Sequence, residues 1–166
     1  ETRILVGVVW ESTAATTGFA KVGYKEKDFD DDSRGTFYGT DWEVGIDWQP
    51  VSYSTVRIST SADTFETNGE GDFIRGQSYS VRWNHDWLER VSTSFSVTQQ
   101  NDEYVFNEID IVNRDDELMN YSAALNYQAR RWLKFSTFYQ YTDRDSNRDT
   151  IGYDKSEIGV TVEVTL

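Results

Sequence analysis

The stretch SYSVRWNHDWLERVSTSFSV, residues 78–97, contains two alternating runs separated by a short polar break. Apolar or aromatic positions of the first run are Tyr79, Val81, Trp83, His85 and Trp87, and small, polar or charged residues lie between them. After the break at Leu88–Val91, Phe95 and Val97 alternate with serines. Because successive side chains of a β-strand point to opposite faces, this period of two predicts two antiparallel strands joined by a tight turn.

The same alternation recurs along the whole chain, and apolar spacing typical of a helix is scarce. The alternating segments with their apolar ends are Ile4–Trp10, Ala20–Tyr24, Trp42–Trp48, Val56–Ala62, Tyr79–Trp87, Thr93–Val97, Met119–Tyr127, Leu133–Tyr141 and Ile158–Leu166. The sequence therefore predicts an all-β fold of about nine antiparallel strands, in one domain over residues 1–166.

Composition excludes several classes of protein. The 166 residues carry a formal charge of −13, which argues against nucleic-acid binding. The absence of cysteine excludes a disulfide scaffold and a thiolate metal site. No apolar run has the length of a transmembrane helix, so hydropathy alone would describe an acidic soluble protein. A membrane-spanning β-strand, however, shows only half of its residues to lipid.

Short and long connections alternate between the expected strands. The short ones lie at Ala14–Thr17, Gln49–Ser52, Leu88–Val91 and Arg130–Trp132. The long ones are acidic: KDFDDDSRG (27–35), ETNGEGDF (66–73), NDEYVFNEIDIVNRDDE (101–117) and DRDSNRDTIGYD (143–154). Short periplasmic turns and long outer loops are typical of an antiparallel up-and-down transmembrane β-barrel.

Aromatic residues make up 15% of the chain and gather near both sets of connections. Close to the short turns lie Trp48, Tyr53, Trp83, Trp87 and Trp132. Near the long loops lie Tyr24, Phe37, Tyr38, Phe65, Phe73 and Tyr141. Because indole and phenol groups favour the membrane–water interface, we expect two aromatic girdles around a lipid-facing surface. The alternative is a soluble ligand-binding β-barrel with the apolar face turned inward.

Several ordered motifs resemble one family of bacterial outer-membrane proteins. They are KVGYKEKDFDD (21–31), WEVGIDWQPVSYST (42–55), ETNGEGDF (66–73), WNHDW (83–87), NYQARRWL (126–133) and YQYTDRDSN (139–147). Together they resemble the putative β-barrel porin 2 family, which implies an outer-membrane barrel of a Gram-negative bacterium that takes part in export or assembly of exopolysaccharide. The implied partners are outer-membrane lipid, lipopolysaccharide, polysaccharide and periplasmic export components.

The resemblance also implies a longer barrel, of which this chain would be the C-terminal part. Members usually end in an aromatic residue, and Leu166 stands in that place. The order of the connections makes the first and last strands run in the same direction. Since bacterial single-chain barrels have even strand numbers, either an odd number of strands precedes Glu1 or the count of nine is off by one, and we expect the former.

Charged residues on the face opposite the apolar rows are candidates to line a pore. They are Lys21, Lys25, Asp41, Glu43, Asp47, Arg57, Arg82, Asp86, Lys134, Arg144 and Glu163. They either form opposed charged rings that select solutes, or pair with one another as structural ion pairs. Phe19 and Phe138 on the same face could stack on sugar rings or pack against neighbouring side chains.

No set of residues indicates catalysis, so we expect no enzyme, no cofactor and no metal. His85 is the only histidine, and it falls on the aromatic face. The spacing of Asp143, Asp145, Asn147 and Asp149 resembles a calcium loop. The glycine at the sixth position and the terminal glutamate of such a loop are missing, so a solvated acidic loop is the expected structure. A general diffusion porin remains the second functional hypothesis.

Overall fold

The computed structural model describes residues 2–27, 37–67, 73–106 and 112–165, and these residues form a single layer of β-strands. The strands are β1 (Thr2–Thr13), β2 (Thr16–Lys27), β3 (Phe37–Val51), β4 (Ser54–Glu66), β5 (Phe73–Leu88), β6 (Val91–Val105), β7 (Arg114–Arg130), β8 (Leu133–Ser146) and β9 (Tyr153–Val164). In this part of the chain, no helix is long and apolar enough to cross a membrane.

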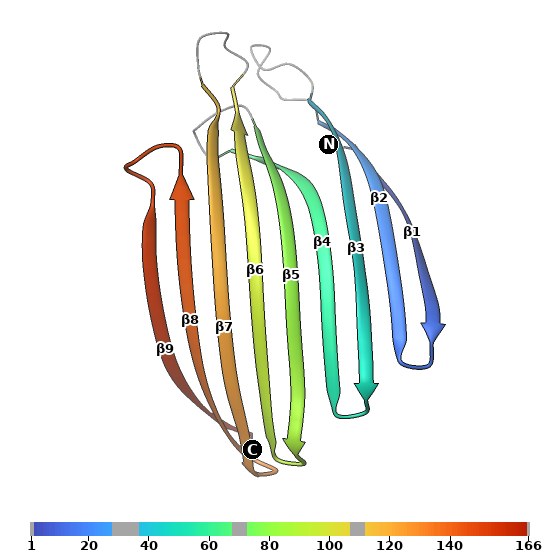
Figure 1. Cartoon of the computed structure of the whole chain (residues 1–166), viewed down its shortest axis with the longest axis vertical. Helices are drawn as coiled ribbons and strands as arrows, with labels where there is room; N and C mark the ends of the chain where they lie inside the picture. Colours follow the sequence, from blue (N-terminus) through green and yellow to red (C-terminus); the bar gives the residue numbers. More distant parts are fainter. Residues whose placement is uncertain (1, 28–36, 68–72, 107–111, 166) are drawn as a thin grey trace.

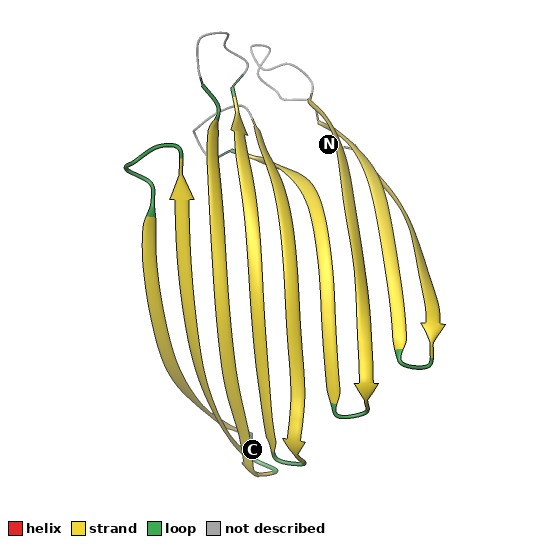
Figure 2. Cartoon of the chain, in the orientation of Figure 1, coloured by secondary structure: helices red, strands yellow, loops and turns green. Residues whose placement is uncertain are grey.

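The strands follow one another in the sheet in chain order, and every neighbouring pair is antiparallel. Four tight turns, at residues 14–15, 52–53, 89–90 and 131–132, lie at one end of the sheet, and the described connection at residues 147–152 lies at the opposite end (Figures 1 and 2). The predicted nine-stranded antiparallel meander is therefore confirmed. Among the described residues the sheet is open, with β1 and β9 at its edges.

Two acidic stretches that the sequence analysis assigned to loops are strand at both of their ends. Residues 101–105 continue β6 and 114–117 begin β7, and Asp102 lies opposite Asp116 in the register. Likewise, β8 runs to Ser146 and β9 begins at Tyr153, so Asp143 lies opposite Asp154. Connections do lie within 101–117 and 143–154, but the predicted bounds were too wide because main-chain hydrogen bonds extend a ladder beyond the last apolar residue. The two earlier long connections fall mostly outside the described residues.

The cross-strand register joins the separate apolar rows into one surface. Ile46 lies opposite Ile58, Ile58 opposite Val81, and Val81 opposite Val97, from β3 to β6. The surface formed by these rows is the apolar face, and the opposite side of the sheet is the polar face. Since side chains alternate with a period of two, a shift of one residue in any pairing would exchange the two faces of that strand.

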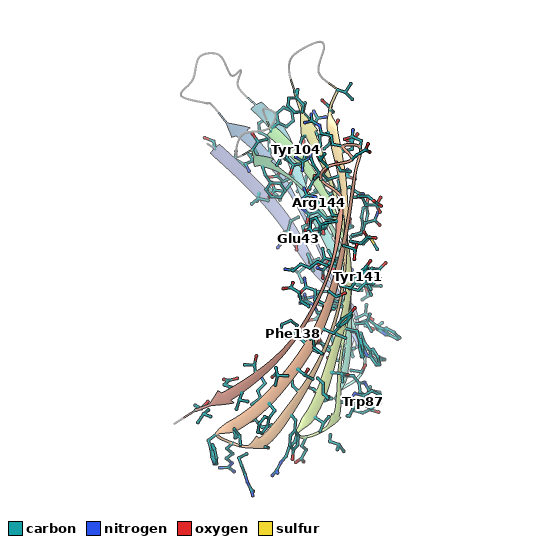
Figure 3. All side chains as sticks on the ribbon, turned by 90° about the vertical axis from the view of Figure 1, so that its left-hand side faces the viewer. Glu43, Trp87, Tyr104, Phe138, Tyr141 and Arg144 are labelled. Atoms are coloured by element: carbon teal, nitrogen blue, oxygen red, sulfur yellow. The ribbon has the colours of Figure 1, made fainter. Side chains whose placement is uncertain are left out.

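The described residues contain no buried apolar side chain. On the apolar face, Ile4 is 64% exposed, Ile158 80% and Val160 74%. Figure 3 shows the sheet curved, with Trp87 and Tyr141 on its convex side and Glu43 and Phe138 on its concave side. The side chains of the apolar face therefore form no core within the sheet, and they point away from the space that the curved sheet encloses.

The height of the apolar face can be compared with a bilayer along β7. Its apolar row runs from Met119 to Tyr127, eight residue steps, which is roughly 27 Å at ~3.4 Å per residue. A strand tilt of about 40° reduces this to a height of roughly 20 Å, close to the apolar band of about 25 Å in outer-membrane barrels. The apolar face thus has the height of a hydrocarbon layer.

This assignment of faces can be tested with nitroxide labels on the protein in lipid bilayers. Labels at Val44, Val81 and Leu125 should collide readily with oxygen, which dissolves in lipid, and poorly with a water-soluble nickel chelate. Labels at the neighbouring positions Ser80 and Asn126 should show the opposite preference. Electron paramagnetic resonance power saturation measures both, and labels at the first three positions shielded from oxygen would contradict a lipid-facing apolar face.

Candidate functional site: the polar face of the sheet

All eleven charged residues that the sequence analysis proposed as pore-lining lie on the polar face. The pairings place Lys21 opposite Glu43, Asp47 opposite Arg57, and Lys134 opposite Glu163. Lys25, Asp41, Arg82, Asp86 and Arg144 follow the same alternation on their own strands. The charges proposed to line a pore therefore all lie on the concave side of the sheet.

Most of this charge is neutralised by cross-strand ion pairs. The Lys21 Nζ lies 2.8 Å from a Glu43 carboxylate oxygen, and the Lys134 Nζ lies 3.7 Å from Glu163. Arg57 donates from Nε and Nη2 to the two Asp47 oxygens at 2.5 and 2.7 Å. These pairs are exposed, so each contributes at most about 1 kcal/mol to stability. For these six residues the geometry favours structural ion pairs over opposed charged rings.

A buried charge cluster at the loop end of the polar face was missed by the sequence analysis. The Asp116 carboxylate accepts hydrogen bonds from Arg114 and Arg144, and the Arg114 guanidinium lies 4.2 Å from the centre of the Tyr104 ring. Arg114 is 8% exposed and Asp116 4%. The stretch was assigned to a loop, although Arg114 and Asp116 continue the alternation of Leu118 and Asn120.

Asp116 lies beyond the apolar row of β7, which begins at Met119. Burial raises the pKa of its carboxyl, but hydrogen bonds from Arg114, Ser146 and Arg144 outweigh that effect and lower the pKa to about 2. A lowered folded-state pKa means that the cluster stabilises the fold at neutral pH. That stabilisation is lost as the pH falls from about 4 towards 2.

Between the charged positions, the polar face of β4 to β8 carries neutral hydroxyl and amide groups, which we call the hydroxyl–amide surface. Its residues are Ser59, Ser61, Ser78, Ser80, Ser94, Ser96, Thr98, Asn120, Ser122, Asn126, Ser136, Gln140 and Thr142. The Ser96 and Ser122 hydroxyls are 2.6 Å apart, and Asn120 Nδ2 donates to the Thr142 hydroxyl at 3.0 Å. The serine alternation around residue 94 was the sequence signal for this surface.

Phe19 and Phe138, proposed to stack on sugars, each lie over a glycine on the neighbouring strand. Phe19 is opposite Gly45 and Phe138 opposite Gly159. A Cβ atom at Gly45 would lie 2.6 Å from the Phe19 ring. An aromatic side chain over a strand glycine fills the space of the missing side chain and covers the backbone. One side of each ring therefore serves packing, while Phe138 remains 43% exposed.

Phe65 corrects the expected girdle at the loop end. It lies over Gly76 on the polar face, where a Cβ atom at Gly76 would be 2.6 Å from the Phe65 ring. Phe65 lies on the same face of β4 as Arg57, eight residues earlier, and this is the concave face. It therefore does not belong with the lipid-facing aromatic residues. Tyr24 and Tyr141 lie on the apolar face as expected, and the side chains of residues 37 and 38 fall outside the described part.

The aromatic residues near the short turns form a contact cluster on the apolar face. The Trp83 ring stacks on Phe95 at 5.7 Å, and the His85 ring lies 4.3 Å from Trp87 and 5.4 Å from Tyr53. The two indole nitrogens donate at 2.9 Å to hydroxyls, from Trp83 to Ser54 and from Trp87 to Thr93. The proposed interface residues Trp48 and Trp132 are 49% and 53% exposed at the same end.

The stretch that resembled a calcium loop is divided between a strand and a turn. Asp143 and Asp145 belong to β8 and lie on the convex side, whereas the Asn147 amide donates to the main-chain oxygen of Asn113 at 2.9 Å. Within the described ranges, no three His, Cys, Asp or Glu side chains are grouped as metal ligands.

A curved antiparallel meander with an exposed apolar convex face and a hydrogen-bonding concave face has the construction of a porin-like β-barrel wall. The family described as putative beta-barrel porin 2 matches residues 1–166, so the chain belongs to this family of β-barrel porins. The predicted family and all-β barrel class are thereby confirmed. No curated protein and no solved structure matches the chain.

The buried cluster should stabilise the loop end of the sheet. Asp116→Asn removes the carboxylate that accepts hydrogen bonds from both Arg114 and Arg144, and we expect the free energy of unfolding to fall by about 3–5 kcal/mol. Urea unfolding in lipid vesicles, followed by tryptophan fluorescence, measures this change. The control Glu157→Gln removes the exposed pair with Lys155 and should cost less than about 1 kcal/mol. Equal effects of the two substitutions would contradict a stabilising role of the cluster.

Proposed function

We propose that this chain forms the wall of an outer-membrane passage for carbohydrate, and that it serves in export or assembly of exopolysaccharide. The observation that carries this proposal is the hydroxyl–amide surface on the concave face of β4 to β8. Membership of the porin family supports an outer-membrane location and a role without catalysis.

Neutral hydroxyl and amide groups suit a sugar chain because they can both donate and accept hydrogen bonds. Ser96, Ser122 and Asn126 bond to one another or to neighbours at 2.6–2.8 Å, and a sugar hydroxyl can exchange with these partners at little net cost. Conduction requires many weak sites rather than one tight site. A row of short polar side chains along five strands meets that requirement.

The apolar face indicates which molecules surround the barrel. The exposed valine, isoleucine and tryptophan side chains of the apolar face require a hydrocarbon environment. We infer contacts with outer-membrane lipid and lipopolysaccharide there, and with periplasmic export components at the short turns. A soluble ligand-binding barrel would need the apolar face on the concave side, opposite to its position in Figure 3.

A general diffusion porin is the second candidate, and the ion pairs favour it. Because Lys21–Glu43, Asp47–Arg57 and Lys134–Glu163 neutralise one another, they leave little field to discriminate between small ions. Such a porin would conduct salts without binding sugars.

Planar-bilayer recordings of the reconstituted protein distinguish these functions. A neutral oligosaccharide such as maltohexaose should reduce the salt current by reversible binding, in a concentration-dependent manner. Replacing Ser96 and Ser122 together by valine should weaken this block roughly three- to tenfold, because the bonded hydroxyl pair would lose one net hydrogen bond to the sugar, worth about 0.5–1.5 kcal/mol.

The matched control is Thr137→Val on the apolar face, which should leave the block unchanged. Conductance without any sugar block would favour the general diffusion porin. Protein that stays dissolved without detergent and yields no channels would contradict both membrane functions.

A further inference from the structure

Arg82 differs from the other cations of the polar face. Seven described cations of this face, between the turns and the loops, each have a carboxylate oxygen within 4 Å. They are Lys21, Lys25, Arg57, Arg114, Lys134, Arg144 and Lys155. Arg82 has no hydrogen bond or ion pair with any described residue, and it is exposed on β5. It therefore carries an uncompensated positive charge on the concave side.

The residue opposite Arg82 makes this arrangement unusual. The register of β4 and β5 places Arg57 directly opposite Arg82. Like charges at opposed positions destabilise an antiparallel pair. Arg57 is neutralised on its other side by the two hydrogen bonds to Asp47, so no carboxylate of β3 remains for Arg82. A local arrangement that opposes stability is a mark of a functional position.

The other neighbours of Arg82 are neutral. Ser96 lies opposite on β6, and Ser80 and Asn84 precede and follow on the same face of β5. Along β5 itself, the next charged residue on that face is Asp86, four residues away, which is roughly 13 Å along a strand. This exceeds the Debye length of about 8 Å at physiological salt. The guanidinium thus projects from the hydroxyl–amide surface as a fixed cation with no carboxylate partner among the described residues.

We propose that Arg82 binds the carboxylate groups of acidic sugars, so that the carbohydrate handled by this protein is anionic. This inference rests on the proposed function, and it adds the chemical class of the solute. The planar guanidinium offers parallel N–H donors that match a carboxylate, and adjacent serine hydroxyls can bond to the ring hydroxyls of the same sugar. Because the site lies on an exposed, hydrated face, binding is weak enough for release.

The experiment compares two hexasaccharides of equal length in planar bilayers with the intact protein. Oligogalacturonate carries one carboxylate per sugar, and maltohexaose carries none. At neutral pH the native channel should be blocked by oligogalacturonate at a concentration roughly fivefold lower than by maltohexaose, the ratio expected for about 1 kcal/mol of screened ion pairing.

Arg82→Gln should abolish this preference and leave block by maltohexaose within about twofold, whereas Arg82→Lys should retain part of the preference. The matched control Lys134→Gln removes a paired cation from the same face, and it should preserve the fivefold ratio. Because Arg82 is exposed, both glutamine variants should fold, which unchanged circular dichroism and tryptophan fluorescence of the reconstituted protein verify.

The outcomes separate this inference from the proposed function. Native channels that bind both sugars equally, or an Arg82→Gln channel that keeps the preference, would overturn the assignment of Arg82 and leave the carbohydrate passage intact. Native channels that bind neither sugar would overturn the proposed function itself. Loss of the preference in Lys134→Gln as well as in Arg82→Gln would show a general effect of net charge, and it would also overturn the specific site.

Discussion

The cross-strand register is the constraint on which the rest of this structure depends. The described residues form one sheet without a buried apolar core, so its order is held by main-chain ladders and by side-chain pairs between neighbouring strands. One consistent register places Ile46, Ile58 and Val81 in a row. The same register gathers serines and charged residues on the other side. The pairing of the strands therefore produces both the apolar face and the polar face.

The polar face combines two kinds of group with different roles. Ion pairs such as Lys21–Glu43 cancel charge where it would otherwise repel or trap a solute. The neutral hydroxyl–amide surface is left as the part that can exchange hydrogen bonds with a passing molecule. Arg82 is the exception among the described cations that lie on the polar face between the turns and the loops, because the register sets it against another arginine. The proposed selectivity for acidic sugars depends on this exception.

Packing within a single layer explains the aromatic residues of the concave face. With no second layer to cover them, Gly45 and Gly76 would leave main chain open to water, and Phe19 and Phe65 lie over them. At the loop end, the hydrogen bonds of Arg114 and Arg144 to Asp116 hold β7 and β8 together instead. These contacts stabilise a wall whose concave side must stay polar.

The sequence by itself determined the strands, their antiparallel order and the face of every proposed pore-lining residue, because alternation with a period of two is a local property of the backbone. It also carried the family motifs. Only the tertiary structure decided where β6 and β8 end and where β7 begins, since a ladder continues through acidic residues that no local pattern marks as strand. The partners of Arg57 and Asp116, the glycines beneath Phe19 and Phe65, and the isolation of Arg82 are likewise properties of the register. They depend on which residue of the next strand lies opposite, and that is fixed only when the strands pair.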